Sequence, residues 1–283
     1  MKRKQMQLSG AVLAAVLVAG ISQGSILVRD EFNTTGGPDY ANGLYESGSD
    51  IGDAGGNATC TGGSIVGFDS SKAWNQAGYF DAYANVIRLL HRTYGATYEG
   101  REISASVAGK TKAYARTSAR MRSSSASASS AYAYGGFGGT AQLGSAGGAT
   151  VGFNWDGSNW DLTLRYRNSS GVTTATIMED ITVNSTYGMI WEMDDTANTI
   201  KVWVDETDLN NAADLTVSWA GTITDISHMT FGFSETGSSG DIYYYDMMLG
   251  DTAQDVGAIP EPGTLSMFGL ATFGALLIRR IRM

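Results

Sequence analysis

The chain of 283 residues has only one cysteine, three prolines and two histidines. The single cysteine, Cys60, cannot form a disulfide within the chain, and a lone cysteine is most often a small buried residue. Neither His91 nor His228 has a neighbouring ligand at metal spacing, which argues against a zinc or iron centre. The sequence also lacks a Gly-x-Ser-x-Gly elbow and a Walker A loop, so nothing indicates the hydrolase or nucleotide chemistry of these motifs.

Basic residues are scarce as well. There are 19 Lys and Arg against 28 Asp and Glu, a formal net charge of −9. Segments 1–24 and 260–283 contain six of the basic residues and only one of the acidic residues. The part of the chain between them is therefore more acidic still. This balance argues against nucleic acid as a partner, because phosphates need a basic surface, and it favours solubility and association with cations or a matrix.

The N-terminus has the layout of a secretory signal peptide. Basic residues at 2–4 precede a short apolar segment at 8–21, and small residues at 22 and 24 offer a cleavage site. We expect segment 1–24 to form a signal helix that engages the export translocon. A retained N-terminal anchor is the alternative, and in either case the rest of the chain is exported.

The C-terminus carries a second targeting pattern in three parts. Pro260, Glu261 and Pro262 precede an apolar run at about 264–278. The run is somewhat shorter than the ~20 residues that span a bilayer, and local thinning of the bilayer can close this gap. The prolines keep the segment before the run extended. A basic stop that favours the cytoplasmic side follows, made up of Arg279, Arg280 and Arg282.

The sequence Ile-Pro-Glu-Pro-Gly-Thr at 259–264, with its apolar helix and terminal arginines, resembles the PEP-CTERM sorting tail of bacterial exosortase substrates. The resemblance covers residues 258–283. It implies a transmembrane helix that anchors the chain in the inner membrane until an exosortase-type transpeptidase removes the tail. It further implies delivery to the envelope, outer surface or extracellular matrix of a Gram-negative-type bacterium. An ordinary tail anchor is the alternative.

Between the two signals, residues 25–257 are enough for one large β domain. Two alternating runs at 151–155 and 160–167 flank a Gly-containing turn, which predicts a hairpin. In the second run the apolar residues share one face, and Asp161, Thr163, Arg165 and Arg167 share the other, so a sheet with one wet side is expected. A further hairpin is predicted from 187–193 and 200–204, and strands from 215–219, 229–233 and 242–249. This spacing of turns is typical of an antiparallel sandwich or jelly roll.

The first half of the chain is less regular. Segments 85–91 and 102–107 are predicted strands. Segment 123–130 is almost pure Ser and Ala, and fits either a flexible loop or a flat strand that ends in one. The glycines near 135–148 follow no phosphate-binding pattern and are interpreted as turn residues.

The order of segments also resembles a known fold family. A mature start at 25–32 precedes a Gly-rich segment around Asp39 and Tyr40, and the chain's last predicted strand begins at Ile242. This order resembles the concanavalin A-like (laminin-G-like) jelly rolls that often precede PEP-CTERM tails. The resemblance implies an all-β antiparallel sandwich in which the first and last strands lie near each other. The Ser/Ala tract departs from the family pattern and leaves the middle strands open.

The same fold also carries laminarinase-type glycoside hydrolases, whose signature is Glu-x-Asp-x-x-Glu. Glu192 and Asp194 begin the signature, but Ala197 stands where the second glutamate belongs. Retaining hydrolysis needs two carboxyl groups with separate roles, so one glutamate is not enough. Asp194 and Asp195 also begin a turn, where carboxylates are usually solvated turn-formers. No catalytic residue is therefore predicted, although a glycoside hydrolase stays a distant alternative.

Binding functions remain open. Calcium is one, because Asp39, Asp50, Asp53 and Asp69 lie in loops, but their spacing defines no ligand set. Glycan binding through tryptophan is another, against the ordinary role of tryptophan in β-sandwich cores. By alternation Trp203 opposes the apolar face of its strand and is the candidate for an exposed sugar platform. The leading hypothesis is a structural or adhesive protein held in an extracellular polysaccharide matrix, and the alternative is a lectin-like carbohydrate-binding module.

Overall fold

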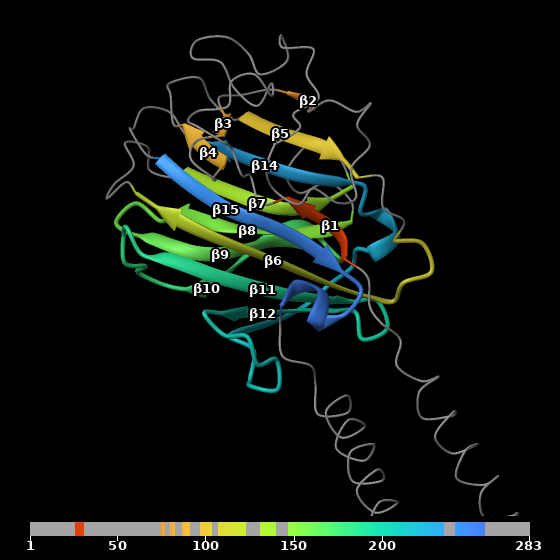
Figure 1. Ribbon diagram of the computed structural model, residues 1–283. Helices are drawn as coiled ribbons and strands as arrows, with labels where there is room; N and C mark the ends of the chain where they lie inside the picture. Colours follow the sequence, from red (N-terminus) through yellow and green to blue (C-terminus); the bar gives the residue numbers. More distant parts are fainter. Residues whose placement is uncertain are drawn as a thin grey trace, which may run out of the picture.

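A computed structural model describes residues 26–30, 75–76, 80–82, 87–90, 97–103, 107–122, 131–139, 147–234 and 241–257. These residues form two antiparallel β-sheets that pack face to face (Figure 1). The expected all-β antiparallel sandwich is thus confirmed. The predicted signal helix and C-terminal transmembrane helix lie outside the described residues, as do the Ser/Ala tract, His91, Trp74, Cys60 and the four loop aspartates.

The eight-stranded sheet contains both ends of the described chain. Its order is β13-β12-β11-β6-β15-β4-β3, and β1 pairs with the second half of β15. First and last strands therefore neighbour each other, as the resemblance implied. The strands are β1 Ile26–Asp30, β3 Phe80–Ala82, β4 Ile87–Leu90, β6 Lys112–Met121, β11 Thr186–Asp194, β12 Thr199–Val204, β13 Leu215–Ser218 and β15 Asp241–Gly250.

The seven-stranded sheet has the order β10-β9-β8-β7-β14-β5-β2. Its strands are β2 Asn75–Gln76, β5 Thr97–Glu102, β7 Ala131–Gly138, β8 Gly148–Trp155, β9 Trp160–Asn168, β10 Gly171–Met178 and β14 His228–Ser234. Two short 3-10 segments complete the described structure, η2 Ile223–Asp225 and η3 Ala253–Val256. None of the helices in this part of the chain is long and apolar enough to cross a membrane.

Both predicted hairpins are confirmed. In the first hairpin, a tight turn joins Trp155 at the end of β8 to its partner Trp160 at the start of β9. The Asp156 carboxylate accepts hydrogen bonds from the N–H groups of Ser158 and Asn159 at 2.7 and 2.8 Å. Gly157 has φ +105°, which a residue with a side chain rarely adopts. β11 and β12 form the second hairpin.

The predicted strands at 215–219, 229–233 and 242–249 correspond to β13, β14 and β15, and the one at 85–91 contains β4. Of the strand expected at 102–107, the structure shows Glu102 as the last residue of β5, while residues 104–106 lie outside the described part of the chain. β10 was not predicted. The glycines near 135–148 were expected in turns, yet Gly135, Gly136, Gly138 and Gly148 lie within β7 and β8.

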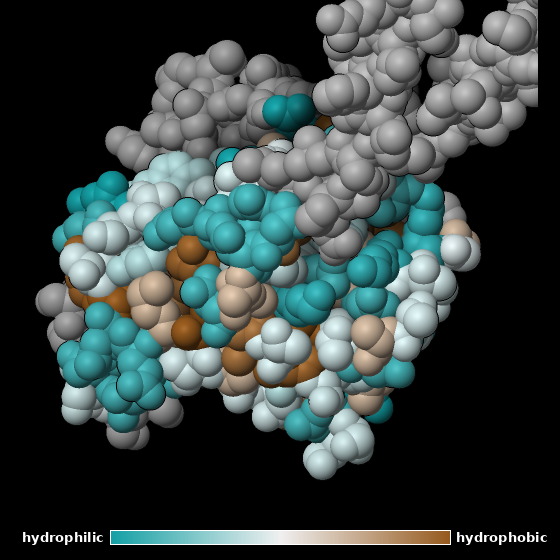
Figure 2. Space-filling view, turned by 90° about the horizontal axis from the view of Figure 1, so that it is seen from below, coloured by the Kyte–Doolittle hydropathy of each residue, from teal (hydrophilic) through white to brown (hydrophobic). Residues whose placement is uncertain are grey.

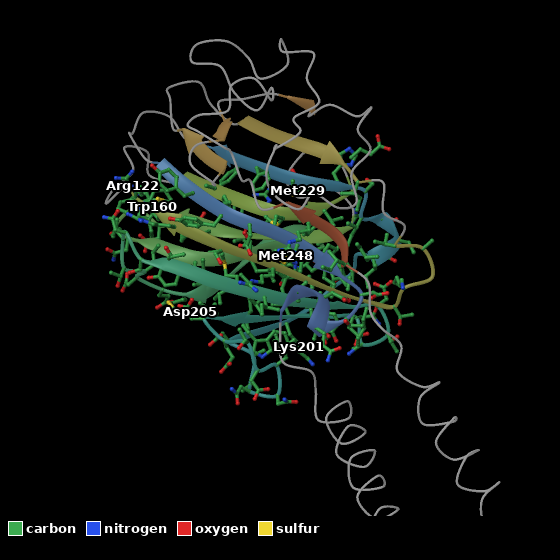
Figure 3. All side chains as sticks on the ribbon, viewed as in Figure 1. Arg122, Trp160, Lys201, Asp205, Met229 and Met248 are labelled. Atoms are coloured by element: carbon green, nitrogen blue, oxygen red, sulfur yellow. The ribbon has the colours of Figure 1, made fainter. Side chains whose placement is uncertain are left out.

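Side chains from both sheets fill the space between them (Figure 3). Tyr244 of β15 crosses this core, and its hydroxyl donates to the Val151 carbonyl of the opposite sheet at 3.1 Å. Its ring packs edge-on against Phe231 with centroids 5.3 Å apart. Gly135 makes room for both rings, because a Cβ there would lie 2.8 Å from the Phe231 ring and 2.9 Å from that of Tyr244. A glycine inside a strand here reflects close packing of two sheets.

The outer face of the eight-stranded sheet is partly covered. Trp203 and Ile190 project outward and form a second buried cluster, which the loop at 205–214 and η3 complete. The members of the cluster are Tyr114, Ile190, Trp203, Leu209, Ala253 and Val256. The outer face of this sheet is therefore only partly accessible to solvent.

Candidate functional site

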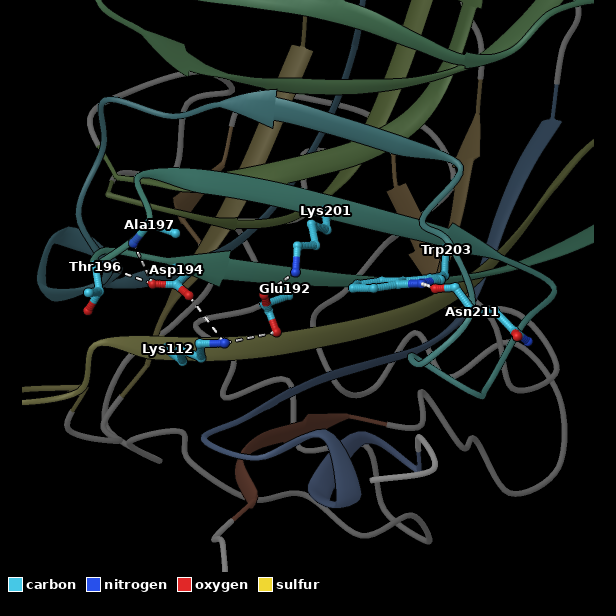
Figure 4. Close-up of polar contacts among 8 residues, drawn as sticks. All are labelled: Lys112, Glu192, Asp194, Thr196, Ala197, Lys201, Trp203 and Asn211. Atoms are coloured by element: carbon cyan, nitrogen blue, oxygen red, sulfur yellow. Dashed lines mark hydrogen bonds and ion pairs between the residues drawn. The ribbon is translucent and has the colours of Figure 1, made fainter. Parts of the chain in front are cut away.

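Glu192 and Asp194 lie side by side on the outer face of β11, where they pair with lysines from the neighbouring strands (Figure 4). Lys112 Nζ lies 3.4 Å from Glu192 Oε2 and 3.2 Å from Asp194 Oδ2. Lys201 Nζ lies 3.4 Å from Glu192 Oε1. The carboxylates are buried, with 1% and 7% of each residue exposed, while the lysines are more accessible. Both acids are therefore committed to ion pairs.

Asp194 also closes the β11–β12 turn. Its Oδ1 accepts the N–H groups of Thr196 at 2.8 Å and Ala197 at 2.9 Å. Burial acts to raise the pKa of Asp194, but the Ala197 N–H, the Lys112 ammonium and the Thr196 N–H together outweigh burial and hold this pKa below its usual value. The predicted turn-forming role is confirmed, whereas the predicted solvation is wrong. A carboxylate kept ionised in this way is a structural group and a poor proton donor.

Trp203 does not have the exposure predicted for it. The alternation was right, since Trp203 lies opposite the core face of β12, but only 3% of the residue is exposed. The loop at 205–214 covers the ring, and the indole N–H donates to the Asn211 carbonyl at 3.0 Å (Figure 4). Trp203 thus offers no open face to a sugar. Trp155, Trp160, Trp191 and Trp219 are buried as well.

Polar side chains that the sequence analysis did not single out as a site gather on the outer face of the seven-stranded sheet. We call this the polar sheet face, defined by Tyr132, Tyr134, Thr150, Thr163, Arg165, Arg167 and Thr230. Alternation places them there, because Ala149, Val151, Leu164 and Tyr166 point into the core. The predicted outward face of Thr163, Arg165 and Arg167 is confirmed, although Thr163 is buried.

One cross-strand row runs through the middle of this face. Thr230 of β14 pairs with Gly136 of β7, Gly136 with Thr150 of β8, and Thr150 with Arg165 of β9. Because Gly136 has no side chain, the row is low at its centre. Beside it lies a small hollow, which we call the Thr150 hollow. Its outward wall is formed by Gly138, Gly147, Gly148, Thr150, Arg165, Arg167 and Thr230.

Two polar atoms at this hollow have no hydrogen-bond partner among the described residues. They are Thr150 Oγ1, in a residue 3% exposed, and Arg165 Nε. The Arg165 guanidinium lies 5.3 Å from the ring centroid of Tyr132 and 5.8 Å from that of Tyr134. A cation over aromatic faces is held in place without being neutralised. Unsatisfied buried groups of this kind call for an explanation, and a ligand is one.

Tyr134 lies on the same face of the sheet, next to Arg165. Its ring reaches across Gly152, and its hydroxyl lies 3.3 Å from Thr163 Oγ1. Burial raises the pKa of Tyr134 above its usual value, which the hydrogen bond to Thr163 only partly offsets. Tyr134 is therefore neutral at physiological pH, and the arginines are the charged groups of this face.

No group of three His, Cys, Asp or Glu side chains that could hold a metal occurs among the residues with described positions. His228 belongs to the edge of the polar sheet face, with Nδ1 2.8 Å from Ser227 Oγ. Calcium at Asp39, Asp50, Asp53 and Asp69 stays a prediction.

Comparison with known proteins identifies the C-terminal segment. Residues 258–282 match the model of the PEP-CTERM protein-sorting motif. The matched segment contains Pro260, Glu261 and Pro262 together with the three terminal arginines. The chain therefore carries a PEP-CTERM sorting motif. No curated protein matches the sequence.

Several solved structures are similar to part of this chain. A sialidase is 10% identical, with a TM-score of 0.42 over 62% of this chain and 16% of the sialidase. The CBM2 module of the evolved Dit protein of Lactobacillus casei BL23 phage J-1 is 12% identical, with a TM-score of 0.42 over 62% of this chain and 80% of the module. The binding domain of botulinum neurotoxin DC is 12% identical, with a TM-score of 0.44 over 65% of this chain and 44% of the toxin chain. At these identities the likeness concerns the fold alone.

Proposed function

We propose that this protein is exported, anchored briefly in the inner membrane and sorted through its tail to the envelope, outer surface or extracellular matrix of a Gram-negative-type bacterium. The observation that carries the proposal is the PEP-CTERM match at residues 258–282. In this proposal residues 1–24 are the signal peptide, residues 25–257 are a concanavalin A-like cargo domain, and an exosortase-type transpeptidase acts on the tail.

The cargo domain would have a structural or adhesive role. Its described carboxylates at the hydrolase-like segment are engaged by Lys112 and Lys201, which supports a non-catalytic assignment. A β-sandwich with an acidic, soluble composition suits a matrix component.

The sorting proposal is tested by replacing Pro260, Glu261 and Pro262 with alanine in the native host. Fractionation with an antibody to the β-sandwich is expected to find the wild-type protein at the surface or in the matrix, and the triple variant in the inner membrane. Glu179→Ala removes an equal charge from an exposed site and serves as the control. Equal distribution of the triple variant and the wild type would count against sorting through this motif.

A carbohydrate-binding function is the alternative, and the polar sheet face favours it. Sugar sites commonly combine polar groups with aromatic surface, and this face presents Arg165 over Tyr132 beside an unpartnered threonine hydroxyl. A glycan array probed with the full-length protein in detergent, with and without calcium, tests this alternative. Uniform absence of binding would refute it.

A further inference from the structure

The geometry points to the Thr150 hollow as a binding site for the anionic group of an acidic polysaccharide, with a uronate carboxylate as the group it fits. This inference rests on the carbohydrate-binding alternative above and gives it a ligand class and a place. It assigns the charge recognition to Arg165 and Arg167, and a hydrogen bond to the Thr150 hydroxyl.

Two arginines give the hollow a positive charge. Arg165 and Arg167 are two residues apart on β9, so they project from the same face of the strand. Among the described residues neither makes an ion pair, whereas Arg116 pairs with Asp246 and Lys112 with Glu192 and Asp194. Two neighbouring cations without a counter-ion on a chain of net charge −9 create a local positive potential that attracts an anion.

The Thr150 hydroxyl is buried at the hollow and has no hydrogen-bond partner among the described residues. Thr150 lies directly opposite Arg165 in the β8–β9 register, and its Oγ1 has no partner although 97% of the residue is buried. A bound carboxylate would accept from both the hydroxyl and a guanidinium N–H, which is the kind of charge-assisted contact that arginine makes best. One ligand group would thus satisfy both of the unpartnered polar groups that border the hollow.

Two glycines leave part of the wall of the hollow free of side chains. Gly147 and Gly148 have φ values of +81° and +73°, and a Cβ on Gly148 would lie 2.1 Å from the Phe137 carbonyl oxygen. The backbone there is therefore restricted to glycine, which leaves the wall free of side chains. Asp225 lies against Gly147 but is not one of the residues that line the hollow, so no described acid competes for the two arginines there.

A polymer fits this surface better than a free anion because the sheet continues beyond the hollow. On β10, Val172 pairs with Arg167 and Thr174 with Arg165, and both β10 side chains are exposed. Seen from below, the molecule shows patches of hydrophobic surface among polar residues (Figure 2). Among the described residues, Val172 and Met178 are the large hydrophobic side chains that are exposed. Neighbouring sugars can rest their C–H faces on such methyl groups while one carboxylate oxygen enters the hollow, whose volume of about 10 Å³ has room for a single water-sized atom.

The test measures binding of the full-length protein in detergent to four probes by calorimetry. The probes are polygalacturonate, its methyl ester, dextran sulfate and dextran. We expect the protein to bind polygalacturonate and not the ester, because esterification removes the charge and keeps the sugar backbone. Binding should weaken as salt is raised, since the contact is ionic.

Variants locate the site. The double variant R165Q/R167Q should weaken binding at least ~10-fold, which is the range expected for lost charge-assisted hydrogen bonds, and T150V should weaken it severalfold. Arg120→Gln removes the same charge from the outer face of the other sheet and should leave binding unchanged. Near-ultraviolet circular dichroism of each variant checks its fold, and T150V keeps the test valid if the double variant unfolds.

The outcomes separate this inference from the proposals above. An equal loss in Arg120→Gln, or unchanged binding in both R165Q/R167Q and T150V, would overturn the site. Binding to the ester or to dextran as strong as to polygalacturonate would overturn the anionic ligand and leave the carbohydrate-binding alternative standing. Binding to dextran sulfate alone would overturn the uronate and assign a sulfated polymer. Absence of binding to all four probes would overturn the inference while leaving sorting through the tail untouched.

Discussion

Thr150 and Thr163 offer a matched pair in which the same substitution should have opposite effects on stability. Both residues are buried, and they lie on the same face of adjacent strands. Thr150 Oγ1 has no partner, whereas Thr163 Oγ1 bonds to the Tyr134 hydroxyl at 3.3 Å. A Thr→Val change replaces the hydroxyl by a methyl group of similar size and hardly alters the volume.

An unsatisfied buried hydroxyl costs about 1–3 kcal/mol, and removing it together with its desolvation penalty is neutral to stabilising. Thr150→Val should therefore raise the free energy of unfolding by about 1 kcal/mol. Thr163→Val deletes a hydrogen bond and leaves the Tyr134 hydroxyl with one partner fewer, so it should lower the free energy of unfolding by about 1 kcal/mol. For a domain of this size each kcal/mol corresponds to about 2–4 °C in Tm.

Thermal and urea unfolding of the two variants, followed by circular dichroism, measure the difference. The expected gap in Tm is about 4–8 °C, with Thr150→Val above the wild type and Thr163→Val below it. Equal shifts of the same sign would refute the claim that the Thr150 hydroxyl is unsatisfied. If Thr150→Val is more stable and also binds polygalacturonate more weakly, the hydroxyl is retained at a cost in stability, as binding groups often are.

Three further predictions concern a core tyrosine, a buried glutamate and a partly buried histidine. Tyr244→Phe should lower the free energy of unfolding by about 1 kcal/mol, because it loses the hydrogen bond to the Val151 carbonyl. The control Tyr166→Phe, also at a buried tyrosine, should have little effect. Equal effects of the two variants in urea unfolding would argue against the hydrogen bond between the sheets. Glu192→Gln should lower stability by about 1–3 kcal/mol without changing any glycanase activity, and an activity that disappeared with it would revive the hydrolase hypothesis. Burial lowers the pKa of His228 below its usual 6.5, against the opposing charge of Glu102. As the pH falls, the unfolded chain therefore binds a proton at His228 before the folded chain does. The free energy of unfolding should then be highest above pH 6.5 and decrease as the pH drops toward the lower pKa of the folded state. His228→Gln should remove this pH dependence, and an unchanged pH dependence in urea unfolding would contradict the prediction.

Local patterns were enough to predict most strands of the second half of the sandwich, although not β10. Alternation fixes which face of a strand meets the core, so the hairpin from Val151 to Arg167 and the strand of Trp203 were oriented correctly. Alternation says nothing about what covers the opposite face. Trp203 is buried because the loop at 205–214, which directly follows its strand, and η3, which is distant in the sequence, both fold over it.

The polar sheet face could not be predicted from the sequence either, because it brings β14 beside strands that are distant from it along the chain. Thr230, Gly136, Thr150 and Arg165 become neighbours only through the register of four strands. A signal for the face was present in Thr163, Arg165 and Arg167 on one side of their strand. The glycines of β7 were read as turn residues because a sequence does not reveal that Gly135 faces two aromatic rings across the core.

The central claim is that the tail directs this chain to the cell surface and is removed on the way. Mass spectrometry of the mature protein from its native host tests this claim most directly. The account predicts a C-terminus that ends within or before the segment 258–283, with no peptide that contains Arg279, Arg280 or Arg282. A mature protein intact through Met283 would contradict it.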